Sequence, residues 1–139
     1  MKINIILEMS MMLLSFSAFA VKPPLSVKTA FNQKFPNVPK VNWGKEDSTE
    51  YEAEFLMNGI EMSVNFSSDG TWLETETEIP LEKLPANVLE AVKKQVKPNA
   101  IKEASKIESD KKGILFEVEV KIGLKTRELF FKEDGTEVK

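Results

Sequence analysis

The sequence predicts an α+β fold, in which two helices pack on one face of an antiparallel sheet of about seven or eight strands. Two observations lead to this prediction. Each half of the chain reads as one short helix followed by segments in which apolar and polar residues alternate. The two halves also match each other, so we expect two helix-plus-hairpin repeats, residues 21–79 and 80–139, preceded by a signal peptide over residues 1–20.

The first helix is predicted between Ser26 and Pro36. Val27, Phe31 and Phe35 recur at the four-residue spacing that places side chains on one helix face. Ser26 is a plausible N-cap, and Pro36 ends the segment because proline cannot continue a helix.

The second helix is predicted from Pro85 to Pro98. Proline suits the first helical position, and Val88, Val92 and Val96 form an apolar stripe. Both predicted helices are short and apolar on one side only. They are therefore expected to gain their stability by packing against a sheet.

Tight turns predict how the strands of the first half pair. Asn58-Gly59 is a strong two-residue hairpin signal, which sets Val64 opposite Ala53. Asp69-Gly70 predicts the next turn, which sets Phe66 opposite Leu73. Both turns place the apolar residues of the shared strand on the same face. A further strand is expected around Val41-Asn42-Trp43.

The second half repeats this plan. Gly123-Leu124 predicts a hairpin turn that puts Phe116, Val118, Val120, Ile122, Leu129 and Phe131 on one buried face. Asp134-Gly135 predicts a last turn, with room for a short strand over residues 136–139. Another strand is expected within residues 101–108.

The two halves align with one another along most of their length. Residues 51–55 match residues 116–120 at an offset of 65 positions, and the Asp-Gly-Thr turns at residues 69–71 and 134–136 match at the same offset. The helices match at an offset of 61, with Pro24 meeting Pro85. A short insertion is therefore expected in the second half, around residues 111–113.

The N-terminus has the features of a secretory signal peptide. Residues 3–19 are mostly apolar after Lys2, and Ala18-Phe19-Ala20 carries small residues at the two positions that a signal peptidase reads. The run is shorter than the roughly 20 apolar residues that span a bilayer. We therefore expect cleavage after Ala20, no stable membrane anchor afterwards, and a protein located in the periplasm or secreted.

Composition excludes several classes of function. The chain has 139 residues with no Cys and no His, so it cannot form a Ser-His-Asp triad, a cysteine nucleophile, or a thiolate or imidazole zinc site. Its formal net charge of −3 argues against a nucleic-acid partner. We expect a protein that is not an enzyme and needs neither a cofactor nor a metal.

The pattern resembles exported PepSY-like proteins related to the beta-lactamase-inhibitor-like fold. The resemblance lies in Leu84-Pro85-Ala86-Asn87-Val88 opening a helix, a proline near its end, and alternating strands that end in Asp-Gly-Thr. It covers residues 24–139. It implies an exported, non-enzymatic protein whose open sheet face can bind another protein. The inhibitor members are typically disulfide-bonded, and this chain has no Cys, so inhibition of a beta-lactamase is not implied.

The candidate site is an acidic patch on the sheet face away from the helices. The predicted pairing gathers Glu52, Glu54, Glu61, Glu74, Glu76 and Glu78 there. Three interpretations are open for this patch: a solvated face, a surface for a basic partner, and a calcium site. Strand side chains point in parallel, which suits a calcium site least.

Trp72 is predicted to lie on the same outer face, in phase with Glu74. An outward tryptophan is either a binding anchor or a cover for its neighbours. The leading hypothesis is a module that binds a periplasmic or cell-surface protein through Trp72, Glu74, Glu76, Glu78, Glu52 and Glu54. The alternative is a small-molecule or lipid carrier with a cavity between the helices and the sheet.

Overall fold

The computed structural model describes residues 21–139, and the predicted signal peptide over residues 1–20 lies outside this range. The described chain forms one eight-stranded antiparallel sheet whose strands follow chain order. The strands are β1 (Val41–Lys45), β2 (Glu50–Met57), β3 (Ile60–Ser67), β4 (Trp72–Ile79), β5 (Ile101–Ser109), β6 (Gly113–Ile122), β7 (Lys125–Phe131) and β8 (Glu137–Val138). Two α-helices, α1 (Leu25–Lys34) and α2 (Ala86–Lys93), complete the fold, with short 3-10 turns at Leu81–Lys83 and Pro98–Ala100.

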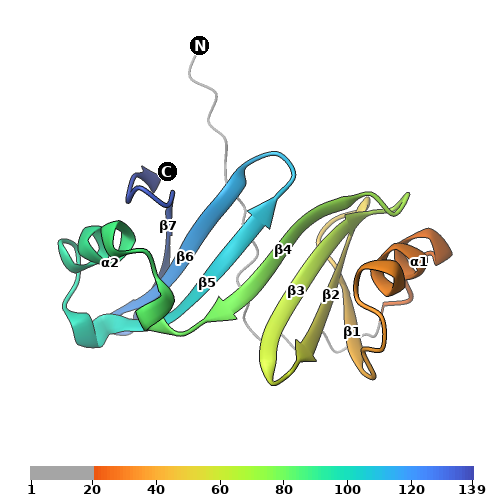
Figure 1. The fold of residues 1–139 in the computed structure, drawn as a ribbon, viewed down its shortest axis with the longest axis horizontal. Helices are drawn as coiled ribbons and strands as arrows, with labels where there is room; N and C mark the ends of the chain where they lie inside the picture. Colours follow the sequence, from red (N-terminus) through yellow and green to blue (C-terminus); the bar gives the residue numbers. More distant parts are fainter. Residues whose placement is uncertain (1–20) are drawn as a thin grey trace, which may run out of the picture.

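The two helices lie toward opposite ends of the sheet (Figure 1). Helix α1 packs against strands of the first half, and α2 packs against strands of the second half. The residues that they cover all belong to one face, as the β4–β5 pairs Thr77↔Lys106 and Ile79↔Ala104 show. We call this side the helix face and the other side the open face. The predicted α+β class is confirmed, and the strands of both halves form one continuous sheet.

Helix α1 begins two residues earlier than the sequence indicated. Pro24 occupies the N-cap position, so the prediction of Ser26 as the cap was wrong. The Ser26 hydroxyl instead donates a hydrogen bond to the Ser68 carbonyl oxygen at 2.8 Å, which ties α1 to the β3–β4 turn. Val27 and Phe31 are the buried residues of the helix, as predicted.

Helix α2 follows Pro85 and is shorter than predicted, since it ends at Lys93 rather than near Pro98. Val88 and Val92 are fully buried, as their spacing indicated. The chain then turns toward β5, and Val96 packs only at the margin of the core.

The β2–β3 hairpin has the predicted register, with Ala53 opposite Val64. Asn58 and Gly59 have φ values of 52° and 78°, which is the left-handed geometry that an Asn-Gly hairpin turn requires. The β3–β4 pair also follows the prediction at Val64↔Thr75. A bulge then shifts the register, so that Phe66 faces Trp72 and not Leu73.

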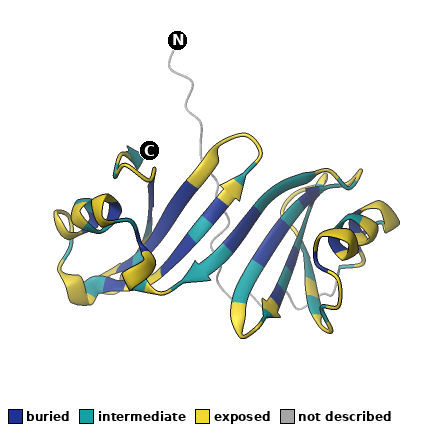
Figure 2. Cartoon of the chain, in the orientation of Figure 1, coloured by how far each residue is buried: buried dark blue, intermediate teal, exposed yellow. Residues whose placement is uncertain are grey.

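Each half of the sheet has its own hydrophobic core on the helix face (Figure 2). In the first half, the Phe31 ring lies 5.1 Å from the Phe55 ring and 5.4 Å from the Trp43 ring in edge-on geometry. Val27 and Val64 are fully buried beneath these aromatic side chains. Aromatic contacts therefore fasten α1 to β1 and β2.

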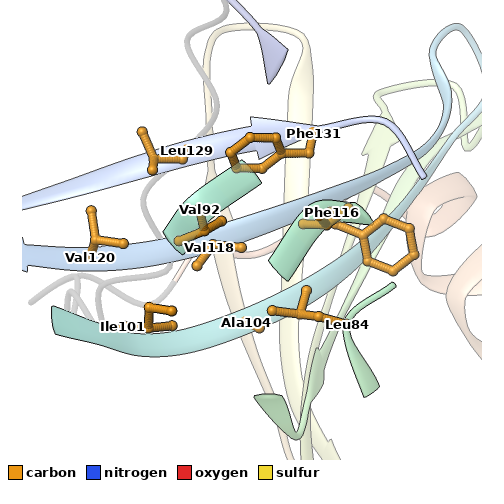
Figure 3. Close-up of a cluster of buried hydrophobic side chains, with 10 residues drawn as sticks. Leu84, Val92, Ile101, Ala104, Phe116, Val118, Val120, Leu129 and Phe131 are labelled. Atoms are coloured by element: carbon orange, nitrogen blue, oxygen red, sulfur yellow. The ribbon is translucent and has the colours of Figure 1, made fainter. Parts of the chain in front are cut away.

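The core of the second half is mainly aliphatic. Figure 3 shows Val92 of α2 beside Val118, with Phe116 and Phe131 toward one side of them and Val120 toward the other. Val118 and Val120 of β6 are fully buried. Removing such side chains from water is the main stabilising contribution in a domain of this kind, which has no disulfides.

Candidate functional site: the open face

The open face carries an extended set of carboxylates. The strand registers place glutamates from β2 to β7 on it: Glu50, Glu52, Glu54, Glu61, Glu74, Glu76, Glu78, Glu103, Glu117, Glu119 and Glu128. Basic residues border this set, with Lys112 near Glu74 and Lys121 at the end of β6. We call these glutamates the acidic set.

The glutamates predicted from the sequence are brought together as expected. Glu54 and Glu76 both face Ser63 across neighbouring strands, and Glu52 and Glu74 both face Asn65. Their placement on the open face therefore follows directly from the two hairpin turns.

Trp72 lies on the helix face, so its predicted position beside Glu74 was wrong. The bulge at Leu73 adds one residue to β4 and turns Trp72 to the opposite side. The indole Nε1 donates a hydrogen bond to the Thr75 hydroxyl at 2.8 Å. The Lys34 ammonium lies 4.6 Å from the ring centroid, and the indole packs against the first core. The Trp72 side chain thus covers the first core beside the end of α1.

The second half contributes carboxylates that the sequence analysis did not include. Glu119 faces Glu103 on one side and Glu128 on the other, and Glu117 faces Ser105. The Gly123-Leu124 turn predicts that Glu119 faces Glu128, because it fixes the β6–β7 register in the same way as the Asn58-Gly59 turn fixes the β2–β3 register. The β5 register follows a bulge near Lys102 and had no tight turn to define it.

The middle of the open face is buried. Ser63, Glu76, Ser105 and Glu117 expose only 3–8% of their surface. Beside them, Ile107, Leu115 and Phe130 form a small buried apolar cluster, with Val138 of β8 at its edge. Phe130 faces Glu117 on the open face, whereas its neighbours Leu129 and Phe131 belong to the core of the second half.

Burial changes the ionisation of the central carboxyl groups. It raises the pKa of Glu117 above the ordinary range, and the negative charge of Glu76 raises it further. Burial also raises the pKa of Glu76, although hydrogen bonds from Ser105 and Glu117 partly oppose this rise. Both effects favour a Glu117 carboxyl that keeps its proton and donates it to the Glu76 carboxylate.

A second, partly buried carboxyl lies in the first half. Burial raises the pKa of Glu52, and the hydrogen bond and charge of Glu46 add to the effect. Burial also raises the pKa of Glu54 and Glu74, for which neighbouring glutamates contribute. Carboxyl groups therefore face one another across the open face, and both their burial and their mutual repulsion disfavour full ionisation.

Two hollows open onto the acidic set. The smaller, of about 20 Å³, is lined by glutamates including Glu76 and Glu117, together with Ser105. The larger, of about 320 Å³, lies near the β2–β3 turn, where Pro39, Phe55, Leu56 and Met62 provide an apolar wall. Glu54, Glu61, Lys40 and Asn42 line the rest of the larger hollow.

Within residues 21–139, no helix is long and apolar enough to cross a membrane. Over the same residues, no group of three or more acidic side chains converges in a way that could hold a metal ion.

Comparison with known proteins identifies the family. The family described as "Putative beta-lactamase-inhibitor-like, PepSY-like" matches residues 49–138. The chain therefore belongs to the PepSY-like family, as the sequence resemblance indicated. No curated protein matches the chain.

Solved structures share the fold over most of their length. A Bacteroides eggerthii structure described as "putative periplasmic proteins" has a TM-score of 0.78 at 21% identity and covers 86% of this chain and 88% of its own. A DUF2874 family protein from Bacteroides ovatus has a TM-score of 0.73 at 26% identity, with 86% of each chain covered. A BLIP-like protein from Bacteroides fragilis has a TM-score of 0.68 at 27% identity and covers 86% of this chain and 85% of its own.

Proposed function

We propose that this protein is an exported, non-catalytic module that binds a basic protein in the periplasm or at the cell surface through its open face. The observation that carries the proposal is the acidic set itself. Its glutamates extend across β2 to β7 on a face that neither helix covers. Charge of one sign on such a face attracts a partner of the opposite sign and speeds its association.

The larger hollow supplies the apolar contact that Trp72 cannot provide from the helix face. Leu56 exposes 60% of its surface at this end of the sheet, and Ile60 exposes 45%. An apolar side chain of the partner would gain affinity by entering the hollow beside Leu56. Glu54 and Glu61 line the same hollow, so the charged and apolar contacts would adjoin.

The packing favours a binding module over a carrier. A carrier needs a cavity between the helices and the sheet. The space directly beneath the helices is filled by side chains that expose 2% of their surface or less, namely Val27 and Phe31 of α1 and Val88 and Val92 of α2. A hollow of about 400 Å³ between α2 and the β7–β8 turn is open and lined largely by polar residues such as Glu90, so it does not form an apolar carrier cavity. The hollow of about 320 Å³ lies at the end of the open face instead.

The experiment combines affinity capture with association kinetics. Residues 21–139 serve as bait in a periplasmic extract, and the association rate of the captured partner is measured at low and high salt. The double variant Glu54→Lys/Glu74→Lys should slow association about tenfold at low salt. These two positions are preferred to Glu76 because Glu76 is buried and its reversal would unfold the chain.

The matched control reverses two exposed charges outside the open face, in Glu82→Lys/Glu90→Lys. It changes the net charge equally and should leave the rate within about twofold. A captured partner that is acidic, or equal slowing by both double variants, would overturn the proposal.

A further inference from the structure

Glu117 combines three properties that are rarely found together. It exposes 6% of its surface, it lies among carboxylates, and its Oε2 atom is buried without a hydrogen-bond partner within residues 21–139. A buried polar atom left unpaired costs roughly 1–3 kcal/mol. Such an atom in a native structure requires an explanation, and a ligand or ion that completes its hydrogen bonding is one.

The surroundings of Glu117 show what kind of ligand would complete it. The small hollow beside it is lined by Glu61, Glu76, Glu78, Glu103, Ala104, Ser105 and Glu119. Glu128, on the neighbouring strand, also acts on Glu117 through its charge. The charged groups that line the hollow are all carboxylates, so it favours a cation that donates hydrogen bonds.

The size of the hollow selects among such cations. Its volume of about 20 Å³ is close to that needed to hold one water molecule. A lysine ammonium is a compact charge with three donors, whereas a guanidinium is a wide planar group. The ammonium is therefore the better fit of the two, and its contact with Glu117 Oε2, an atom closed to solvent, requires a small movement of neighbouring side chains.

We propose that Glu117, Glu76 and Ser105 form a receptor for a single lysine ammonium of the protein partner. The inference rests on the proposed function, and it names the point on the open face at which the partner is recognised. The ammonium would donate hydrogen bonds to Glu117 Oε2 and to the Glu76 carboxylate. Ser105 positions Glu76 through the hydrogen bond of its hydroxyl group.

Binding has a chemical consequence that can be measured. In the free protein the carboxyl pair shares one proton, because two adjacent buried carboxylates cannot both carry charge. An ammonium between them removes that restriction. The O–H bond of Glu117 breaks, its proton passes to the solvent, and both groups bind as carboxylates. Lysine binding should therefore release about one proton at neutral pH.

The test uses residues 21–139 and tetralysine amide as the probe, at low salt and pH 7. Calorimetry in two buffers of different ionisation enthalpy gives the affinity and the number of protons released. Wild type should release about one proton. Glu117→Gln should lose about tenfold in affinity and release none, because a neutral amide replaces a charge-assisted acceptor. Thermal melts verify that the variant is folded.

Three comparisons make the result decisive. Glu50→Gln removes the same charge from a part of the open face outside both hollows and should cost less than about threefold. Equal losses in the two variants would mean that the face attracts cations as a diffuse field, which overturns the receptor and leaves the proposed function standing. Tetra-arginine amide with an acetylated N-terminus carries no ammonium, so its affinity should not depend on Glu117 beyond the loss seen for Glu50→Gln. An equal dependence of both peptides on Glu117 would overturn the selectivity for lysine. If neither peptide binds wild type, both proposals fail.

Discussion

Gly70 lies directly against the backbone of Ser26: a Cβ atom placed on Gly70 would be 2.7 Å from the Ser26 carbonyl oxygen. Gly135 has the same relationship to Asn87, at 2.6 Å. In each half, a glycine of the Asp-Gly-Thr turn thus packs under the first turn of the helix. Both glycines also have left-handed backbone angles, with φ values of 89° and 86°.

The first prediction follows from this close approach. Gly70→Ala and Gly135→Ala should each lower the free energy of unfolding by about 1–3 kcal/mol, because the methyl group meets backbone that cannot move aside and the left-handed angle is strained. Gly59→Ala is the control, since Gly59 has a φ of 78° but nothing within 4 Å of the added Cβ. It should cost less. Denaturant melts in which Gly59→Ala is the most damaging of the three would contradict the role of the close contact.

The second prediction tests the proposed duplication. Val64 and Leu129 occupy matched positions at the offset of 65, and they expose 0% and 8% of their surface. Truncating either to Ala should cost about 2–4 kcal/mol through lost burial and a cavity. Urea unfolding of the two variants measures this directly. A large loss at one position with none at the other would mean that the offset alignment is wrong.

The third prediction concerns Trp72. Since its indole covers the first core and bonds Thr75, Trp72→Ala should destabilise the protein by about 1–3 kcal/mol. Trp72→Phe keeps most of the apolar contact and should cost less. The partner's affinity for the folded fraction should not change, because Trp72 is on the helix face. If Trp72→Ala kept its full stability but bound the partner more weakly, the partner would contact the helix face, which would contradict the proposal.

The fourth prediction is a pH dependence of stability. The pKa of Glu117 is raised in the folded protein above its ordinary value of 4.5, so the folded state binds more protons than the unfolded state above that pH. Its contribution therefore becomes more unfavourable as pH rises from about 4.5 toward the raised pKa. Glu117→Gln removes this penalty and should be more stable than wild type at pH 8 by at least about 1 kcal/mol.

The comparison for Glu117→Gln is made at pH 5, where the difference from wild type should nearly vanish. More acidic conditions are avoided because hydrogen bonds lower the pKa of Asp69 and Asp134, whose stabilisation is lost as pH falls below about 3.8. Urea melts at the two pH values give the result. An equal difference in stability between Glu117→Gln and wild type at both pH values would show that folding does not raise the pKa of Glu117.

The fifth prediction concerns export. If residues 1–20 are a cleaved signal peptide, mass spectrometry of the protein from its native envelope should find Val21 as the first residue. Recovery of the intact chain from Met1 in the membrane fraction would contradict cleavage.

Tight turns explain why so much of the sheet could be predicted. Asn58-Gly59 and Gly123-Leu124 fix their hairpin registers to the residue, so the faces of Val64, Glu54 and Val118 follow from counting. The bulge at Leu73 has no such signal, because it inserts one residue without a glycine or proline to mark it. That single residue is the reason why Trp72 was assigned to the wrong face.

The burial of the central carboxyl groups could not be predicted from the sequence, for a different reason. Alternation shows that Glu76 and Glu117 point away from the core, but it carries no information on how far neighbouring strands enclose them. Glu117 meets Ser105 only through the β5–β6 register, which a bulge near Lys102 adjusts. An outward-facing position was therefore read as an exposed one, and the carboxyl pair was missed.

The seam between the two cores has a mechanical consequence. Where β4 pairs with β5, the helix face carries Thr75, Thr77, Lys106 and Glu108, and only Ile79, at the end of β4, packs across this pair against the second hydrophobic core. The molecule is one layer thick there, while a helix stiffens it on either side. Twisting one half against the other deforms only this ladder of hydrogen bonds. Because Glu76 lies on β4 and Glu117 on β6, the same torsion changes their separation, and a ligand clamped between them would stiffen the hinge.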